Sequence, residues 1–111
     1  MSLFHPLLWK IGCLNSAFAI VCASAGGHKP WDEERKRIFQ KGINLHLFGS
    51  IGIILSSFKH SLFVGLLFLL GTILFSCTAY YRCFKDDKKY NILMPFGGSM
   101  FIIGWIGLAF I

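Results

Sequence analysis

Two histidines and four cysteines are the side chains in this sequence best suited to binding a metal or a redox cofactor. His28 and His46 both lie toward the same basic end of apolar segments, so they could come close together. Paired histidines on neighbouring helices can ligate haem or a metal, or relay protons. The competing interpretation is structural: His46 hydrogen-bonds a neighbouring backbone group or Asn44, and His28 lies at the level of the lipid headgroups.

The cysteines predict neither a metal site nor a disulfide. Cys13, Cys22, Cys77 and Cys83 form no Cys-x-x-Cys pair, and three of them lie within apolar segments. A free cysteine in such surroundings behaves as a small hydrophobe, and its thiolate is disfavoured. The sequence also has no Gly-rich phosphate loop, Ser-His-acid set or His-Glu-x-x-His motif. We therefore predict no catalytic residue, no metal, no required cofactor and no enzyme activity.

The composition indicates a protein that lies in a lipid bilayer. Of 111 residues, 55% are hydrophobic and 14% are charged, which is more apolar surface than a soluble chain of this length can bury. Four windows contain no Lys, Arg, Asp or Glu: 11–28, 42–58, 60–81 and 90–111. Each is close to the ~20 residues that a spanning helix needs, and the lack of Asp and Glu within them argues against an ion-coupled transporter.

These windows predict an all-α membrane protein with one domain, 1–111. We expect four transmembrane helices, roughly 8–27, 42–58, 61–81 and 92–111, in an up-down-up-down antiparallel bundle. Acids precede bases after Pro30, so the second helix should begin near residue 31, outside the bilayer, with Asp32–Lys36 and Glu33–Arg37 ion pairs. Segment 85–89 should be a solvated loop.

The cations predict the orientation. Nine lie in the first and third connections, and only Lys10 and Lys59 lie on the other side. Under the positive-inside rule, the two basic connections face the cytoplasm or the mitochondrial matrix, and both termini face outward. All five acids share these connections, so attraction to anionic phospholipid such as cardiolipin is expected rather than binding to nucleic acid. The residues expected to contact headgroups are Arg35, Lys36, Arg37, Lys41, Arg82, Lys85, Lys88 and Lys89.

Targeting signals allow two interpretations of the first window. Lys10 precedes an apolar stretch that ends in Ala23-Ser24-Ala25, as in a secretory signal peptide, although a retained spanning helix is favoured. The first nine residues contain no Lys or Arg and form no mitochondrial presequence of the usual kind. Trp9, Trp31 and three tyrosines (Tyr80, Tyr81, Tyr90) fall near the predicted span ends, where aromatic rings anchor to headgroups.

Small residues recur at spacings of three and four within the spans. This pattern lets helix backbones approach closely in lipid, where no hydrophobic effect drives helices together. The residues predicted to pack between helices are Gly12, Ala19, Ala23, Gly42, Gly49, Gly52, Gly65, Gly97 and Gly104.

Several short motifs, in order, resemble those of the transmembrane protein 256 family of small membrane proteins, which has bacterial relatives and is a domain of unknown function. The match runs from about Ile11 to the C-terminus. The motifs are Ala23-Ser24-x-Gly26-x-His28, Phe39-x-Lys41 with His46 and Ser50, Thr72-x-Leu74-Phe75, Tyr80-Tyr81, Pro95-x-Gly97-Gly98 and Gly104-Trp105. This chain departs from the family at Gly49, where relatives tend to carry a second histidine, which argues against a two-histidine site within the second span.

The resemblance implies a four-helix protein that lies in mitochondria in animals. One hypothesis is a non-catalytic accessory subunit of an inner-membrane assembly, a respiratory-chain complex, whose partners are other integral membrane subunits. The alternative is a membrane module that binds haem, quinone or lipid through His28 and His46.

Overall fold

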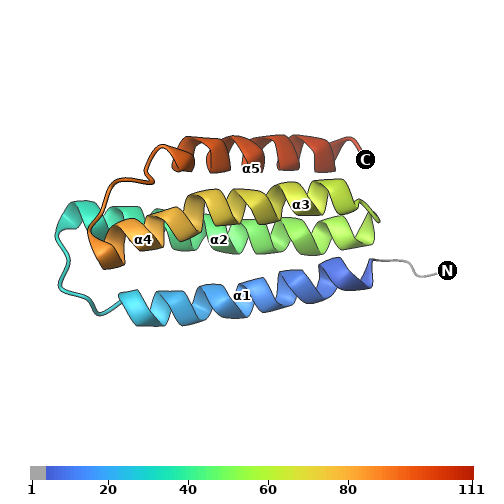
Figure 1. Ribbon diagram of the computed structural model, residues 1–111. Helices are drawn as coiled ribbons and strands as arrows, with labels where there is room; N and C mark the ends of the chain where they lie inside the picture. Colours follow the sequence, from blue (N-terminus) through green and yellow to red (C-terminus); the bar gives the residue numbers. More distant parts are fainter. Residues whose placement is uncertain (1–4) are drawn as a thin grey trace.

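The computed structural model describes residues 5–111, which form helices joined by short connections (Figure 1). The segments are α1 (Pro6–Gly26), α2 (Glu33–Phe58), α3 (Leu62–Gly71), η1 (Thr72–Cys77), α4 (Thr78–Lys85) and α5 (Leu93–Ala109). Because α3, η1 and α4 follow without a break, Leu62–Lys85 is one long helix with a π-helical segment in its middle. The described residues contain no strand, in agreement with the predicted all-α class.

The long helices lie side by side, with α1 and α5 on the outside (Figure 1). α1 packs on α2, α2 packs on the Leu62–Lys85 helix, and α5 packs mainly on α3 and η1. The α1–α2 and α4–α5 connections lie at one end of the molecule, and the start of α1 and the end of α5 lie at the other. We call the first of these the basic end, because its connections and adjoining turns carry Lys29, Arg35, Lys36, Arg37, Lys41, Arg82, Lys85, Lys88 and Lys89.

Three helices are long and apolar enough to cross a bilayer: Pro6–Gly26, Glu33–Phe58 and Leu62–Lys85. α5 is also apolar but has 17 residues, at the lower limit of the range expected for a span. At 1.5 Å per residue α5 is about 26 Å long, against a hydrocarbon layer of about 30 Å. Residues 5–111 thus contain three spanning candidates and one shorter apolar helix, where four spanning helices were predicted.

The start of α2 differs in detail from the prediction. The helix begins at Glu33, and Asp32 is its N-cap, with Oδ1 accepting from the backbone N–H of Arg35 at 2.9 Å. Lys36 pairs with Glu33 at 3.9 Å, so the predicted Asp32–Lys36 and Glu33–Arg37 pairs are replaced by a cap and an i,i+3 pair. A capping carboxylate satisfies a backbone donor at the helix start, which stabilises more than an exposed ion pair does.

The π-helical segment η1 was not predicted from the sequence. Two hydroxyls within it bond to backbone carbonyls: Thr72 Oγ1 donates to Phe68 O at 2.9 Å, and Ser76 Oγ donates to Gly42 O on α2 at 2.7 Å. The second bond ties η1 directly to α2. An apolar run with helical periodicity looks the same in sequence whether one of its turns is α or π, so only packing reveals the wider turn.

Eight of the nine residues predicted to pack between helices are buried, and Ala23 is half-buried. Several of these glycines surround Phe68, whose side chain is fully buried. A Cβ on Gly52 would lie 2.6 Å from the Phe68 ring, and a Cβ on Gly104 would lie 3.1 Å from it. Phe68 thus fills a space between α2 and α5 that exists because both helices carry glycine there.

Replacing Gly49 or Gly104 with leucine should force helices apart. A Cβ on Gly49 would lie 2.9 Å from the Phe101 ring, and the Phe68 ring faces Gly104. We expect each variant to lose about 1–3 kcal/mol of stability through overpacking, measured by thermal unfolding in detergent micelles. Gly98→Leu is the matched control, because a Cβ on Gly98 meets nothing within 4 Å. Equal stability of all three variants would show that these helix contacts are wrong.

Candidate functional site

His46 lies at the centre of a buried polar network that joins three helices. Its side chain is fully buried, with Nδ1 2.8 Å from the hydroxyl of Tyr80 and Nε2 2.9 Å from Oδ1 of Asn15. Asn15 Nδ2 donates to Ser50 Oγ at 2.8 Å, and Ser50 Oγ donates to the backbone carbonyl of His46 at 3.0 Å. The network therefore connects α1, α2 and α4. We call these four side chains the His46 network.

The direction of each hydrogen bond follows from the chemistry of the groups. The Ser50 hydroxyl hydrogen is used on the His46 carbonyl, so Ser50 Oγ accepts from the Asn15 NH2 group. Asn15 then turns its carbonyl oxygen, which only accepts, toward Nε2 of His46, and Nε2 must carry the ring proton. The lone pair on Nδ1 accepts the hydrogen of Tyr80. Because a charged imidazolium without a counter-charge is costly at a fully buried position, we assign His46 as a neutral imidazole with both nitrogens occupied.

The structure does not bring together His28 and His46, the two residues of the cofactor-binding interpretation. α1 ends at Gly26, so His28 lies in the exposed connection beyond it. His46 lies opposite Asn15, eleven residues before Gly26, which is about 16 Å along the axis of α1. The predicted histidine pair is therefore not formed. The partner proposed for His46 is also different: Asn44 accepts from Gln40 at 2.9 Å, and His46 bonds to Asn15 and Tyr80.

Tyr80 and Asn15 are the members of this network that sequence reasoning missed. Tyr80 was expected to anchor at the headgroups, but it is 8% exposed and its hydroxyl faces His46. The available signal was Asn15, a strongly polar side chain within an apolar window, which must find a partner inside the bundle. Spacing along one chain does not show which helix supplies that partner.

The cysteines form no disulfide with one another. Cys13 and Cys77 are exposed, Cys22 is half-buried and Cys83 is buried, and all four are free thiols. Cys83 Sγ lies 3.2 Å from the backbone carbonyl of Arg35. Among the described residues, no group of three or more His, Cys, Asp or Glu side chains is arranged to hold a metal ion.

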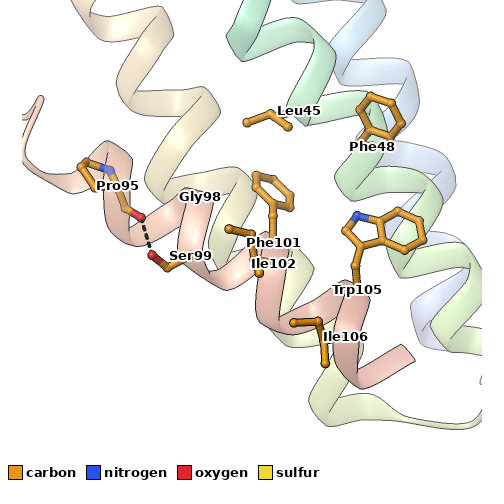
Figure 2. Close-up of a pocket in the computed structure, with 9 residues that line it drawn as sticks. All are labelled: Leu45, Phe48, Pro95, Gly98, Ser99, Phe101, Ile102, Trp105 and Ile106. Carbon is orange, nitrogen blue, oxygen red and sulfur yellow. Dashed lines mark hydrogen bonds between the residues drawn. The ribbon is translucent and has the colours of Figure 1, made fainter. Parts of the chain in front are cut away.

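An open apolar groove of about 660 Å³ lies between α2 and α5 (Figure 2). Leu45 and Phe48 line it from α2, and the other lining residues come from α5: Pro95, Gly98, Ser99, Phe101, Ile102, Trp105 and Ile106. Ser99 Oγ donates to the Pro95 carbonyl at 2.8 Å, so its hydroxyl is used within α5 (Figure 2). The groove thus suits an apolar occupant, and Gly98 leaves room for one beside the backbone of α5.

The basic end contains an ion-pair cluster that the sequence did not predict. Arg82 is 4% exposed, and its guanidinium lies 2.8 Å from Asp86 and 3.9 Å from Glu34. Arg35 donates to the backbone carbonyl of Cys83 at 2.5 Å and lies 3.9 Å from Asp86. The cluster fastens the start of α2 to the end of α4. Segment 85–89 is therefore anchored at Asp86 rather than a purely solvated loop.

Six of the eight residues predicted to contact lipid headgroups are exposed: Lys36, Arg37, Lys41, Lys85, Lys88 and Lys89. Arg82 is buried and Arg35 is half-buried, so the prediction is corrected for Arg82, whose charge is directed to carboxylates of this chain. Lys89 lies over the rings of Tyr90 and Tyr81, at 5.1 and 5.9 Å from their centroids. The neighbouring Tyr81, followed by Tyr90, raises the pKa of Lys89 above its ordinary value, and the lysine is charged at neutral pH.

Apolar outer faces, glycine-mediated packing and a satisfied internal polar network together define a small helical membrane protein. The chain belongs to the family described as "Protein of unknown function (DUF423)", whose match covers residues 20–98. This confirms the predicted membership of a small membrane-protein family of unknown function with bacterial relatives.

Two bacterial proteins named "UPF0382 membrane protein" are similar to this chain. The protein from Staphylococcus epidermidis (strain ATCC 12228) is 27% identical over 108 residues, covering 89% of this chain and 88% of the relative. The protein from Haemophilus influenzae (strain ATCC 51907) is 32% identical over 75 residues, covering 62% of this chain and 60% of the relative. No solved structure matches the chain. The relatives' names agree with a membrane protein and state no activity.

Removing one member of the His46 network should destabilise the bundle more than removing an exposed amide. We expect Asn15→Ala to lower stability by about 1–2 kcal/mol, because it leaves His46 Nε2–H without an acceptor. Asn44→Ala, which removes only the exposed bond to Gln40, should change stability by less than about 0.5 kcal/mol. Thermal unfolding in micelles measures both. Equal effects would contradict a central role for the network.

Arg82→Gln should loosen the basic end. The variant removes ion pairs of a buried guanidinium to Asp86 and Glu34, and we expect a loss of about 1 kcal/mol, because both carboxylates remain partly hydrated. Lys85→Gln removes the same charge from an exposed neighbour and should have little effect. Hydrogen exchange of the backbone amides at the start of α2 and the end of α4 measures this loosening. Unchanged exchange in Arg82→Gln would contradict the proposal that the ion-pair cluster holds α2 and α4 together.

Proposed function

We propose that this protein is a non-catalytic accessory subunit of a membrane assembly, with other integral membrane subunits as its partners. In this proposal α5 crosses the bilayer with the three longer helices, in an up-down-up-down bundle with both termini on the outer side. The positions of the cations support this orientation, since the basic end carries nine of the eleven.

The observation that carries the proposal is the apolar groove between α2 and α5 (Figure 2). Phe48 and Ile102, which line the groove, are 53% and 63% exposed, and Gly98 provides a flat point on α5 where another helix backbone can approach. The residues that line the groove include no ionisable side chain, and their one hydroxyl, that of Ser99, donates to the Pro95 carbonyl. A hydrophobic helix of a partner subunit fits this chemistry.

The outer face of α1 adds a second apolar surface. In its most apolar stretch α1 buries 17% of its residues, against 44% for α2, and Leu14 is 70% exposed. The His46 network holds α1 in place from the inside, which leaves this face available to lipid or to a neighbouring subunit.

The finer form of the proposal places the protein in the mitochondrial inner membrane, in a respiratory-chain complex, with its basic end in the matrix. The resemblance to the transmembrane protein 256 family supports this compartment. The bacterial relatives are named as membrane proteins, and the bacterial cytoplasm is the topological equivalent of the mitochondrial matrix. The exposed cations of the basic end would there contact anionic phospholipid such as cardiolipin.

Native electrophoresis tests the proposal. Membranes solubilised in mild detergent should show the wild-type chain migrating with a larger complex. Gly98→Trp should release it as a free small protein, because a Cβ at Gly98 meets nothing within 4 Å and the indole beyond it would occupy the groove. Thermal unfolding of Gly98→Trp should match that of the wild type, which separates blocked docking from misfolding.

The control is a tryptophan placed away from the groove. Leu14→Trp puts the ring on the exposed face of α1 and should leave migration unchanged if docking uses the α2–α5 groove. A wild-type chain that migrates solely as a small free protein would refute the accessory role. Release by Leu14→Trp but not by Gly98→Trp would move the docking surface to α1.

A further inference from the structure

A second cleft, of about 260 Å³, lies at the basic end between α1 and α2. Its walls are the last turn of α1, the connection that follows and the first three turns of α2. Gly26 lets the Phe39 ring lie close to α1, because a Cβ at Gly26 would lie 2.6 Å from an edge carbon of that ring. Phe39 packs flat against α1 and forms the base of the cleft with Ile43, each only 6% exposed.

The polarity of the cleft changes in one direction along α2. Ile43 and Phe39 line its apolar part, Gln40 lies at its edge, and Lys36 and Lys29 lie toward its outer end. Lys36 precedes Ile43 by seven residues, so cation and apolar base are separated by about 10 Å along the helix axis. This separation is comparable to the depth over which a bilayer changes from headgroup to hydrocarbon. An amphiphile lying parallel to α2 would meet both environments at once.

The charges around the cleft favour an anion. Lys29 and Lys36 are exposed, and the carboxylate nearest to Lys36 is Glu33, at 3.9 Å and 93% exposed in its side chain. Because an exposed ion pair is weak, a phosphate can displace the Glu33 carboxylate from Lys36. The carbonyls of Ala23 and Gly26, at the end of α1, already accept the N–H groups of Gly27 and Lys29, so they add little repulsion. Gln40, although it donates to Asn44, has a second amide hydrogen.

We propose that this cleft binds one anionic phospholipid, with its phosphate between Lys29 and Lys36 and its glycerol and first acyl carbons over Phe39 and Ile43. The inference deepens the lipid contact of the proposed function and rests on the membrane orientation given there. In this proposal the anionic lipid binds at one defined site, whereas the sequence predicted only a general attraction of such lipids to the cations of the basic end. Lys29, which was not among the residues predicted to contact headgroups, becomes a principal ligand.

Native mass spectrometry of the purified full-length chain in detergent, titrated with phosphatidylglycerol, tests the site. Lys29→Gln/Lys36→Gln should weaken binding of the first lipid by about 25-fold, since each cation next to an anionic headgroup contributes on the order of fivefold. Lys88→Gln/Lys89→Gln removes the same charge from the same end but outside the cleft, and should weaken binding by less than about threefold. Equal losses in the two double variants would overturn the site and leave only diffuse attraction.

Steric variants test the same site without changing its charge. Gln40→Trp fills the edge of the cleft and should reduce lipid binding, whereas Asn44→Trp, one turn further along the exposed face and outside the cleft, should not. Phosphatidylcholine should bind weakly, and excess inorganic phosphate should fail to displace phosphatidylglycerol, because phosphate makes no apolar contact. Displacement by phosphate, or normal binding by Gln40→Trp, would overturn a lipid occupant.

The same variants also test the accessory role, through a separate measurement. On native gels, Lys29→Gln/Lys36→Gln should still migrate with the larger complex, because the cleft lies at the basic end and the α2–α5 groove is intact. Loss of lipid with assembly retained supports the cleft alone. Normal lipid binding by a chain that never assembles would reject the accessory role and keep the lipid site.

Discussion

The hydrogen bonds of His46 constrain the rest of this bundle. In hydrocarbon no water compensates for an unpaired polar group, so a fully buried imidazole must find both of its partners within the protein. His46 finds Asn15 on α1 and Tyr80 on α4, which places three helices in one register. Sliding α1 by a single turn would move Asn15 away from His46 and leave Nε2–H unpaired.

This constraint also explains where functional surfaces remain. The strongest polar groups of the interior are used on one another, and His46 is a neutral, doubly bonded ring rather than a ligand with a free nitrogen. At the basic end, Arg82 is likewise occupied by Asp86 and Glu34. What stays open is apolar surface along α1 and α5, together with exposed lysines at one end. Such surfaces are suited to association with helices and lipids.

Glycine gives the bundle its second constraint. Gly52 and Gly104 create the space for Phe68, and Gly26 creates the space for Phe39, so each large ring is matched by a missing side chain on a neighbouring helix. Gly98 differs from these three, because nothing in the chain occupies the space beside it. Under the proposed function, this open position is where a helix of a partner subunit packs.

The sequence by itself determined the helical class, the apolar segments, the concentration of cations at one end and the use of small residues for packing. Each of these depends on periodicity or local composition, which a single chain displays directly. Tertiary structure alone decided that Asn15 and Tyr80 meet His46, that His28 lies beyond the end of α1, that Arg82 turns inward, and that Thr72–Cys77 widens into a π-helix. These features depend on which side chains face each other across helices, and helix rotation and register are fixed only when all polar groups and ring volumes are satisfied together.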